Sequence, residues 1–321
     1  MNLQTKIPLS KQSDNLIDYN SKLVLLGSCF SENIGNKLEY FKFLNSQNPF
    51  GVLFHSKAIE TLLFRAVNEK IYSESDIFFH NERWHCFDAH SGLSDTSKDK
   101  LLSKLNSQLK SFGKSIQNTT HVIIALGTAW VYRFLESNSI VANCHKVPQR
   151  EFGKELLLVE DVHQSLENIT SSLRSINPKA SIIFTVSPVR HLKDGFVENT
   201  LSKSHLIAGI HHFLNQKSSI KNHKSFYFPS YEIMMDELRD YRFYTEDMIH
   251  PNQTAINYIW ETFKKVWVSE DSYKVMEQVD TIQKGLQHKP FNPNSEAHQK
   301  FLQNLEIQKK QINSAFPHIT F

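Results

Sequence analysis

Two residues in the last third of the chain have side chains and spacing suited to acid–base chemistry. Asp247 and His250 stand three positions apart in the segment 245–252. Side chains three apart lie on the same side of a helix or a turn. An aspartate in that position can hold one imidazole nitrogen, fix the tautomer and stabilise the imidazolium. The pair alone is weak evidence, because an exposed loop can carry both residues incidentally.

A nucleophile for this pair stands near the start of the chain, where the apolar run 22–26 ends in Gly27-Ser28-Cys29-Phe30-Ser31. Such a run is typical of a buried parallel strand, so the segment predicts a strand, a tight turn and a helix from about residue 32. Open α/β sheets bind ligands at the carboxyl ends of their strands, so we expect Ser28 to be exposed beside free helix amides. The alternative is that Ser28 only caps the helix.

These motifs resemble those of the GSCFA family, which is itself similar to the SGNH (GDSL-like) esterases and acyl hydrolases. The resemblance covers about residues 22 to 267. Asn48-Pro49-Phe50-Gly51 stands where the SGNH pattern has its second block, and Gly127-Thr128-Ala129-Trp130 stands where it has Gly-x-Asn. The sequence departs from that pattern twice. Gly27, not aspartate, precedes Ser28, and Trp130 takes the place of the asparagine.

The resemblance implies a metal-independent ester hydrolase or acyl transferase that needs no cofactor. Ser28 would attack the acyl carbon, His250 would relay its proton, and Asp247 would orient His250. The amides of Ser28 and Gly51 would hold the oxyanion. The implied substrate is a small-molecule or carbohydrate ester, such as an acetylated sugar or a cell-wall precursor.

Two alternatives stay open. Cys29 would be the nucleophile of a thiol enzyme, because a thiolate at a helix N-terminus is activated. Alternatively, the chain is a non-catalytic carbohydrate-binding module on a decayed hydrolase fold, which the missing asparagine favours. Under the serine mechanism we expect Cys29 to pack behind the turn as a small buried hydrophobe.

The missing asparagine leaves one oxyanion donor to be found. The segment 130–148 predicts a hairpin that ends in a polar cluster containing Asn143 and His145. If the hairpin folds back toward Ser28, either side chain would supply the hydrogen bond; the alternative is a surface loop. Arg190, after the predicted strand 181–188, would either bind a substrate carboxylate or phosphate or pair with an acid of the protein.

Alternating strands and helices predict one three-layer α/β/α domain with a mainly parallel central sheet, over residues 1–270. A second insertion, at about 76–91, has the aromatic pattern of a β-hairpin, and we expect it to cover an apolar edge rather than line a substrate groove. Residues 271–321 predict a helical extension. The expected sheet strands are 22–27, 40–46, 121–126, 181–188 and 225–231.

Composition excludes several classes of protein. Lys and Arg number 36 against 33 acidic residues, and no basic run stands out, so no nucleic-acid partner is expected. Three cysteines are too few for a disulfide framework, which favours a reducing, cytoplasmic setting. The first 18 residues lack the pattern of a secretory signal, and no apolar run has the length of a membrane span. No spacing of Cys and His predicts a metal site, and the sequence leaves the oligomeric state undetermined.

Overall fold

The core of the molecule is a five-stranded parallel sheet. The computed structural model describes residues 5–217 and 224–321, so residues 1–4 of the predicted domain and residues 218–223 lie outside the described part. The strand order is β10-β9-β5-β1-β2, and every pairing is parallel. The strands are β1 (Lys22–Gly27), β2 (Leu44–Gln47), β5 (His121–Leu126), β9 (Ser181–Val186) and β10 (Ser225–Tyr227).

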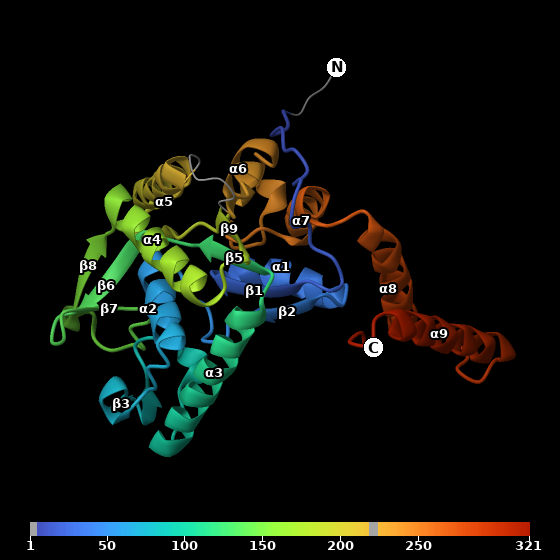
Figure 1. Ribbon diagram of the computed structural model, residues 1–321, viewed down its shortest axis with the longest axis horizontal. Coiled ribbons are helices and arrows are strands. Elements are labelled where there is room, and N and C mark those ends of the chain that lie inside the picture. Colours follow the sequence, from blue (N-terminus) through green and yellow to red (C-terminus); the bar gives the residue numbers. More distant parts are fainter. Residues whose placement is uncertain (1–4, 218–223) are drawn as a thin grey trace.

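The three central strands are almost wholly apolar because helices cover both faces of the sheet. In β1, Val24 and Leu26 face one layer, while Leu23 and Leu25 face the other. The first layer holds α2 (Ser56–Val67), α3 (Lys98–Asn118), α4 (Val159–Ile176) and α5 (Phe196–Lys217); the second holds α1 (Cys29–Tyr40) and α7 (Gln253–Trp267). Figure 1 shows α2 and α4 on one side of the strands and α7 on the other. The predicted three-layer α/β/α architecture is therefore confirmed.

The predicted element boundaries need two corrections. Helix α1 begins at Cys29, because Ser28 already occupies the N-cap position. The helix runs to Tyr40, and Lys42 then adopts a left-handed φ of 64°, so β2 begins at Leu44 rather than at residue 40.

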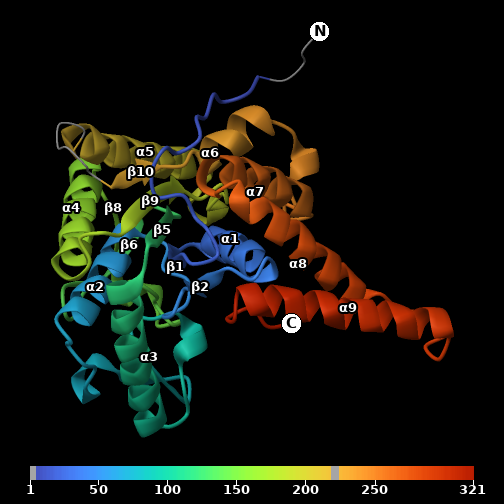
Figure 2. The ribbon, with the colours of Figure 1, turned by 45° about the vertical axis from the view of Figure 1, so that its right-hand side comes forward.

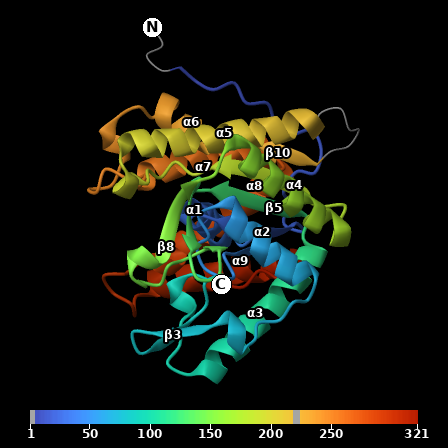
Figure 3. The same ribbon diagram turned by 90° about the vertical axis from the view of Figure 1, so that its left-hand side faces the viewer.

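Two small antiparallel sheets stand apart from the central one. Strands β3 (Phe78–His80) and β4 (Arg83–His85) form the hairpin predicted at about 76–91, with positive φ at both turn residues, as two-residue hairpin turns require. Figure 3 shows β3 beside the lower end of α3. The second hairpin, β6 (Trp130–Phe134) and β7 (Ser139–Val141), gains a third strand that the sequence reading missed, β8 (Phe152–Leu156).

The chain ends in two helices, α8 (Asp271–Gln287) and α9 (Glu296–Ala315), so the predicted helical extension is confirmed. Figures 1 and 2 show α9 projecting beyond the rest of the molecule. Apolar side chains of both helices, including Met276 and Ile312, nonetheless join the hydrophobic cluster of α1 and α7.

The remaining helical elements are short. They are α6 (Ser230–Glu232), a π-helical turn at Ile233–Glu237, and 3-10 turns at Glu74–Asp76, Ser91–Leu93, Gln149–Glu151, Leu192–Asp194 and Tyr241–Phe243. Within residues 5–217 and 224–321, none of the helices is long and apolar enough to cross a membrane.

Candidate active site

The loop before α7 brings Asp247 and His250 together. The Nδ1 atom of His250 lies 2.7 Å from Oδ2 of Asp247. The other carboxylate oxygen accepts hydrogen bonds from the Thr245 hydroxyl at 2.6 Å and from the amides of Ile249 and His250 at 2.8 and 3.0 Å. The Thr245 hydroxyl, followed by His250 and the Ile249 amide, holds the pKa of Asp247 well below its usual range. An ionised carboxylate only accepts, so Nδ1 carries the hydrogen and Nε2 of the half-exposed ring is left as the basic nitrogen.

The same loop is anchored at its two ends. The Thr245 amide donates to the His250 carbonyl at 2.8 Å. Asn252 caps α7 by accepting from the Ala255 amide at 3.1 Å, and its side-chain amide donates to the Tyr244 carbonyl. The geometry of the Asp247–His250 pair therefore depends mainly on hydrogen bonds within about ten residues of chain.

The turn after β1 is fixed by its neighbours instead. Gly27 has a φ of +124°, and a Cβ atom there would lie 2.1 Å from the Ala125 carbonyl oxygen, so only glycine fits. Its amide donates to Oδ1 of Asn48 at 3.0 Å, and the Ser28 amide donates to the Ala125 carbonyl at 2.9 Å. The turn is thus held between β5 and the segment that follows β2.

Ser28 lies inside this turn and has no exposed surface. Its hydroxyl oxygen accepts from the Phe30 amide at 3.3 Å, which is the geometry of an N-cap. The expectation that Ser28 is exposed is therefore wrong, and the capping alternative describes its contacts. Within the described chain no hydrogen bond joins the Ser28 hydroxyl to the His250 ring.

Cys29 has the accessibility that was expected of Ser28. It is the first residue of α1 and is partly exposed, so the expectation that it packs behind the turn is wrong. Burial raises the pKa of the Cys29 thiol and so does Glu32, whereas the residue's own amide and Lys203 lower it. Cys29, unlike Ser28, therefore has accessible surface in this turn.

The two backbone donors expected to hold the oxyanion are already occupied. The Gly51 amide closes a tight turn on the Asn48 carbonyl at 2.7 Å, and the Ser28 amide is bound to Ala125. In the first turn of α1, the Phe30 amide is also bound, to the Ser28 hydroxyl oxygen. Among the described residues, the Cys29 amide donates to no other residue, which leaves it as the available donor of this turn.

The polar cluster at the end of β7 packs elsewhere. The Nε2 atom of His145 lies 2.7 Å from the Cys86 carbonyl oxygen, and the ring packs against His85 and Phe87. Oδ1 of Asn143 accepts the His145 amide at 2.8 Å. These contacts hold the cluster against the segment that follows β4. The described structure gives neither Asn143 nor His145 a hydrogen bond to Ser28, so the predicted replacement for the missing asparagine is not brought to the nucleophile.

A buried lysine that the sequence reading missed lies at the strand ends. Lys203 of α5 is 1% exposed, and its ammonium donates to the carbonyls of Gly127 at 2.7 Å and Ser187 at 2.8 Å. Burial lowers the pKa of Lys203 to about 7, and Cys29 lies close enough to raise it slightly. The sequence carried a signal: Lys203 precedes Leu206, Ile210 and Phe213 on the apolar stripe of its helix.

His191 lies beside this lysine, after β9. Its Nε2 atom is buried without a hydrogen-bond partner and would lie 3.1 Å from a Cβ atom at Gly127, the first residue of the third block. Burial, followed by the charge of Lys203, lowers the pKa of His191 to about 4, so the ring is neutral at pH 7. His250 also acts on it electrostatically, which places the two imidazoles near each other. In the described part of the chain, no three His, Cys, Asp or Glu side chains are arranged to hold a metal ion.

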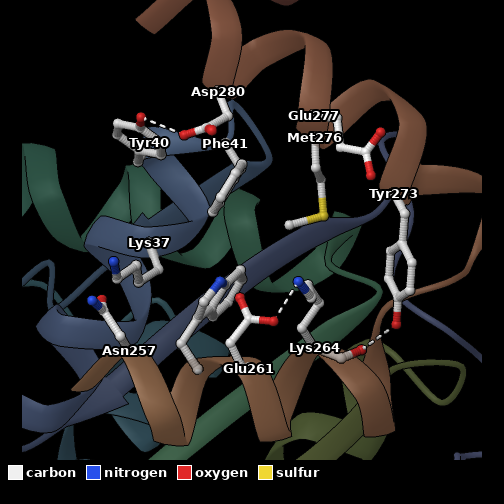
Figure 4. Close-up of a pocket in the computed structure, with 11 residues that line it drawn as sticks. Lys37, Tyr40, Phe41, Asn257, Glu261, Lys264, Tyr273, Met276, Glu277 and Asp280 are labelled. Atoms are coloured by element: carbon white, nitrogen blue, oxygen red, sulfur yellow. Dashed lines mark hydrogen bonds and ion pairs between the residues drawn. The ribbon is translucent and has the colours of Figure 1, made fainter. Parts of the chain in front are cut away.

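One cavity lies away from the polar groups at the strand ends. It is a cavity of about 480 Å³ between α1, α7 and α8. Figure 4 shows the residues that line it, with Tyr40 bound to Asp280 and Glu261 bound to Lys264. Its α1 residues, Lys37 and Tyr40, stand 8 and 11 positions after Cys29, roughly 12–17 Å along the helix axis. The cavity is therefore separate from the strand ends, and its polar groups largely pair with one another.

Comparison with known proteins gives matches at the level of family and of structure. The sequence model of the GSCFA family matches residues 22–263, and that described as GSCFA domain protein, C-terminal domain, matches residues 279–321. A solved structure that is similar is an acetyl xylan esterase, Est2A, from the rumen bacterium Butyrivibrio proteoclasticus, with 12% identity and a TM-score of 0.36. The similarity covers 85% of this chain and 66% of the esterase, just under two thirds of its length. The comparison with curated proteins finds no match.

Proposed function

The chain belongs to the GSCFA family, and we propose that it is an acyl-transfer enzyme, an ester hydrolase or acyl transferase, whose acid–base residue is His250. One observation carries this proposal: Nδ1 of His250 lies 2.7 Å from an Asp247 carboxylate that three further donors orient. This arrangement leaves Nε2 free to accept a proton from a nucleophile and to return it to a leaving group.

We assign the nucleophile to the turn after β1, and within it to Cys29. Two observations support the thiol over the hydroxyl of Ser28. Cys29 is partly exposed, whereas Ser28 is fully buried and bound to the Phe30 amide. Among the described residues of the turn, the amide that donates to no other residue belongs to Cys29. Burial raises the pKa of the Cys29 thiol and outweighs the opposite effect of the Lys203 ammonium, so the thiol needs a base.

The reaction then runs in two balanced steps. The Cys29 sulfur attacks the acyl carbon while His250 takes the thiol proton, and the leaving alcohol receives that proton as its bond to the acyl carbon breaks. Water or a second alcohol next attacks the thioester, gives its proton to His250, and the thiol is regenerated when His250 returns that proton to the sulfur. The Cys29 amide and the neutral His191 ring would donate hydrogen bonds to the oxyanion of both intermediates.

Ser28 is the second candidate for the nucleophile. Burial and Glu32 both raise the pKa of the Cys29 thiol, which weakens the case for a thiol enzyme. The cap bond of Ser28 is long, at 3.3 Å, and the hydroxyl hydrogen is free to be donated. A serine mechanism would require this side chain to turn away from the Phe30 amide. In either form we propose a small-molecule or carbohydrate ester as substrate, as the likeness of the family motifs to those of SGNH esterases implies.

One experiment separates these mechanisms from a binding function. Turnover of p-nitrophenyl acetate is measured for the wild type, Cys29→Ala and Ser28→Ala, and trapped acyl groups or fluorophosphonate labels are mapped by mass spectrometry. A label on Cys29, with turnover lost in Cys29→Ala and kept in Ser28→Ala, supports the thiol mechanism. The reverse pattern supports the serine. A folded wild type that neither turns over activated esters of any acyl length nor becomes labelled overturns the proposed function and favours a carbohydrate-binding module.

A further inference from the structure

Arg190 lies next to the loop that carries the proposed base. Its amide donates to the carbonyl of Ile249, the residue before His250, at 3.4 Å. The guanidinium lies over the ring of Tyr244, 4.7 Å from the centroid, and 5.8 Å from that of Tyr241. Cation–π contacts of this kind hold the flat face of an arginine and leave its N–H edge available.

No carboxylate occupies that edge. Among the described residues Arg190 forms no ion pair, and its recorded side-chain contact is a sulfur of Met235 at 4.0 Å, which is a weak acceptor. The acid nearest in the same cavity wall, Asp240, is bound by Arg242 at 2.9 Å. A partly buried guanidinium with five donors and no anionic acceptor is a site for an anion from outside the protein.

The space in front of Arg190 has the size of one small chemical group. Arg190 and Arg239 line a cavity of about 210 Å³ together with Met235, Tyr241 and Tyr244. Pockets for whole drug-sized ligands are larger, about 300–1,000 Å³. Two arginines in one wall give the cavity a positive character, because Asp240, the acid that lines the cavity with them, is already paired with Arg242.

We propose that Arg190 binds an anionic group, a carboxylate or a phosphate, carried by the ester that this protein cleaves or transfers. The inference rests on the proposed function, and its link to the proposed base is the backbone of Arg190, which is bound to Ile249, the residue before His250. It names the substrate class: an ester with a negative charge on its acyl part or on its alcohol. The planar guanidinium would hold either anion through two parallel N–H···O bonds.

Two matched ester pairs test this and tell the two parts of the substrate apart. For the acyl part, p-nitrophenyl hemisuccinate is compared with p-nitrophenyl butyrate; for the alcohol, 4-acetoxybenzoate is compared with its methyl ester. We expect wild-type kcat/KM to favour the charged member of one pair by about 10- to 100-fold, mainly through KM. In Arg190→Gln the ratio should fall toward one, and Arg190→Lys should keep part of it.

The control is Arg150→Gln, which removes one positive charge from an exposed side chain paired with Glu151 and should leave the charged-to-neutral ratio unchanged. A wild type that cleaves the neutral esters without preferring either charged one overturns the anion site and leaves the proposed function intact. If no ester is cleaved, the proposed function fails, and protection of the wild type from thermal unfolding by inorganic phosphate or benzoate decides the anion site. Protection that Arg190→Gln loses supports the site, and equal melting temperatures with and without both anions overturn it.

Discussion

The two parts of the candidate site are built in different ways. In the turn Gly27–Cys29, Gly27 and Ser28 are buried, and their amides are bound to Asn48 and to β5, far away in the sequence. The loop with Asp247 and His250 is exposed, with 45% and 47% of those side chains accessible, and its hydrogen bonds are local. Hydrogen bonds to the central sheet and to Asn48 hold the turn in place, whereas hydrogen bonds within the loop hold the loop in place.

Because of this difference, substitutions in the two parts should affect stability and catalysis to different extents. A substitution in the turn disturbs the strand pairing that every layer of the fold depends on. A substitution in the loop changes exposed side chains, which usually alters the free energy of unfolding by less than about 0.5 kcal/mol. Under the proposed function we therefore expect substitutions in the loop to give large kinetic effects at nearly constant stability, and substitutions in the turn to lower stability.

His250→Ala should give the largest kinetic effect. Removing the general base should lower kcat by about 10²- to 10⁴-fold, and Asp247→Asn should cost less because Asp247 only orients the ring. Both variants should unfold in urea at nearly the wild-type midpoint. Turnover near the wild-type rate in His250→Ala would remove this residue from the mechanism, and a large loss of stability would show that the loop is not the independent unit described here.

His191 should give the next effect, as the proposed oxyanion donor. His191→Phe keeps an aromatic ring against Phe54 but removes the donor, and kcat should fall about 100-fold with little change in KM. The control is His163→Phe, because His163 also has a buried ring nitrogen without a partner but lies on α4 against His212. Equal kcat values for the two variants would contradict the role of His191.

Gly27→Ala tests the turn. The new Cβ atom would lie 2.1 Å from a backbone oxygen at a φ of +124°, so the free energy of unfolding should fall by about 3 kcal/mol or more. Gly92→Ala is the matched control, because its nearest side-chain atom is 3.5 Å away and its φ is ordinary. Urea unfolding of both variants measures the difference, and similar midpoints would mean that the turn is less constrained than its contacts indicate.

The sequence predicted those parts of the molecule that are determined by the spacing of nearby residues or by runs of apolar residues. Apolar runs such as 121–126 indicate strands buried on both faces, and the spacing of Asp247 and His250 places them in one loop. Strand β8 was not predicted, because it pairs with β6, and strand β7 and a loop separate the two in the sequence.

The accessibility of the nucleophile also escaped prediction. Ser28 and Cys29 are adjacent, and the turn that buries the first and partly exposes the second begins at Gly27 with a positive φ, which no periodicity of the sequence encodes. The burial of Lys203 was not predicted for a related reason. A lysine is ordinarily a surface residue, and only its two carbonyl partners at the ends of β5 and β9 make its burial possible.

Lys203 extends the comparison to pH. Its pKa is about 7 in the folded protein and near the ordinary 10.5 when unfolded, so between these values the unfolded chain binds more protons. Stability should therefore rise from pH 7 toward 10.5, by at most about 1.4 kcal/mol per pH unit, and this contribution is lost as the pH falls through 7. Urea unfolding between pH 6.5 and 9 measures the slope. Lys203→Met should lack it, whereas Lys300→Met, at an exposed pair with Glu296, should keep it. An NMR titration of Lys203 with a midpoint above 9 would contradict the argument even if Lys203→Met fails to fold.

Ser28→Ala should give the smallest effect and makes the sharpest distinction between the two candidate nucleophiles. The substitution removes the acceptor of the Phe30 amide, and loss of an N-cap costs about 1 kcal/mol. If Ser28 is only a cap, the variant should unfold at lower urea and keep the wild-type kcat, because Cys29 and its amide remain. Ser28→Asp is the matched control, because an aspartate at the N-cap can also accept the hydrogen bond of the Phe30 amide. Its free energy of unfolding should exceed that of Ser28→Ala only if the buried turn accepts the negative charge. If kcat falls more than about 100-fold while the protein stays folded, Ser28 has a chemical role and the assignment to Cys29 is wrong.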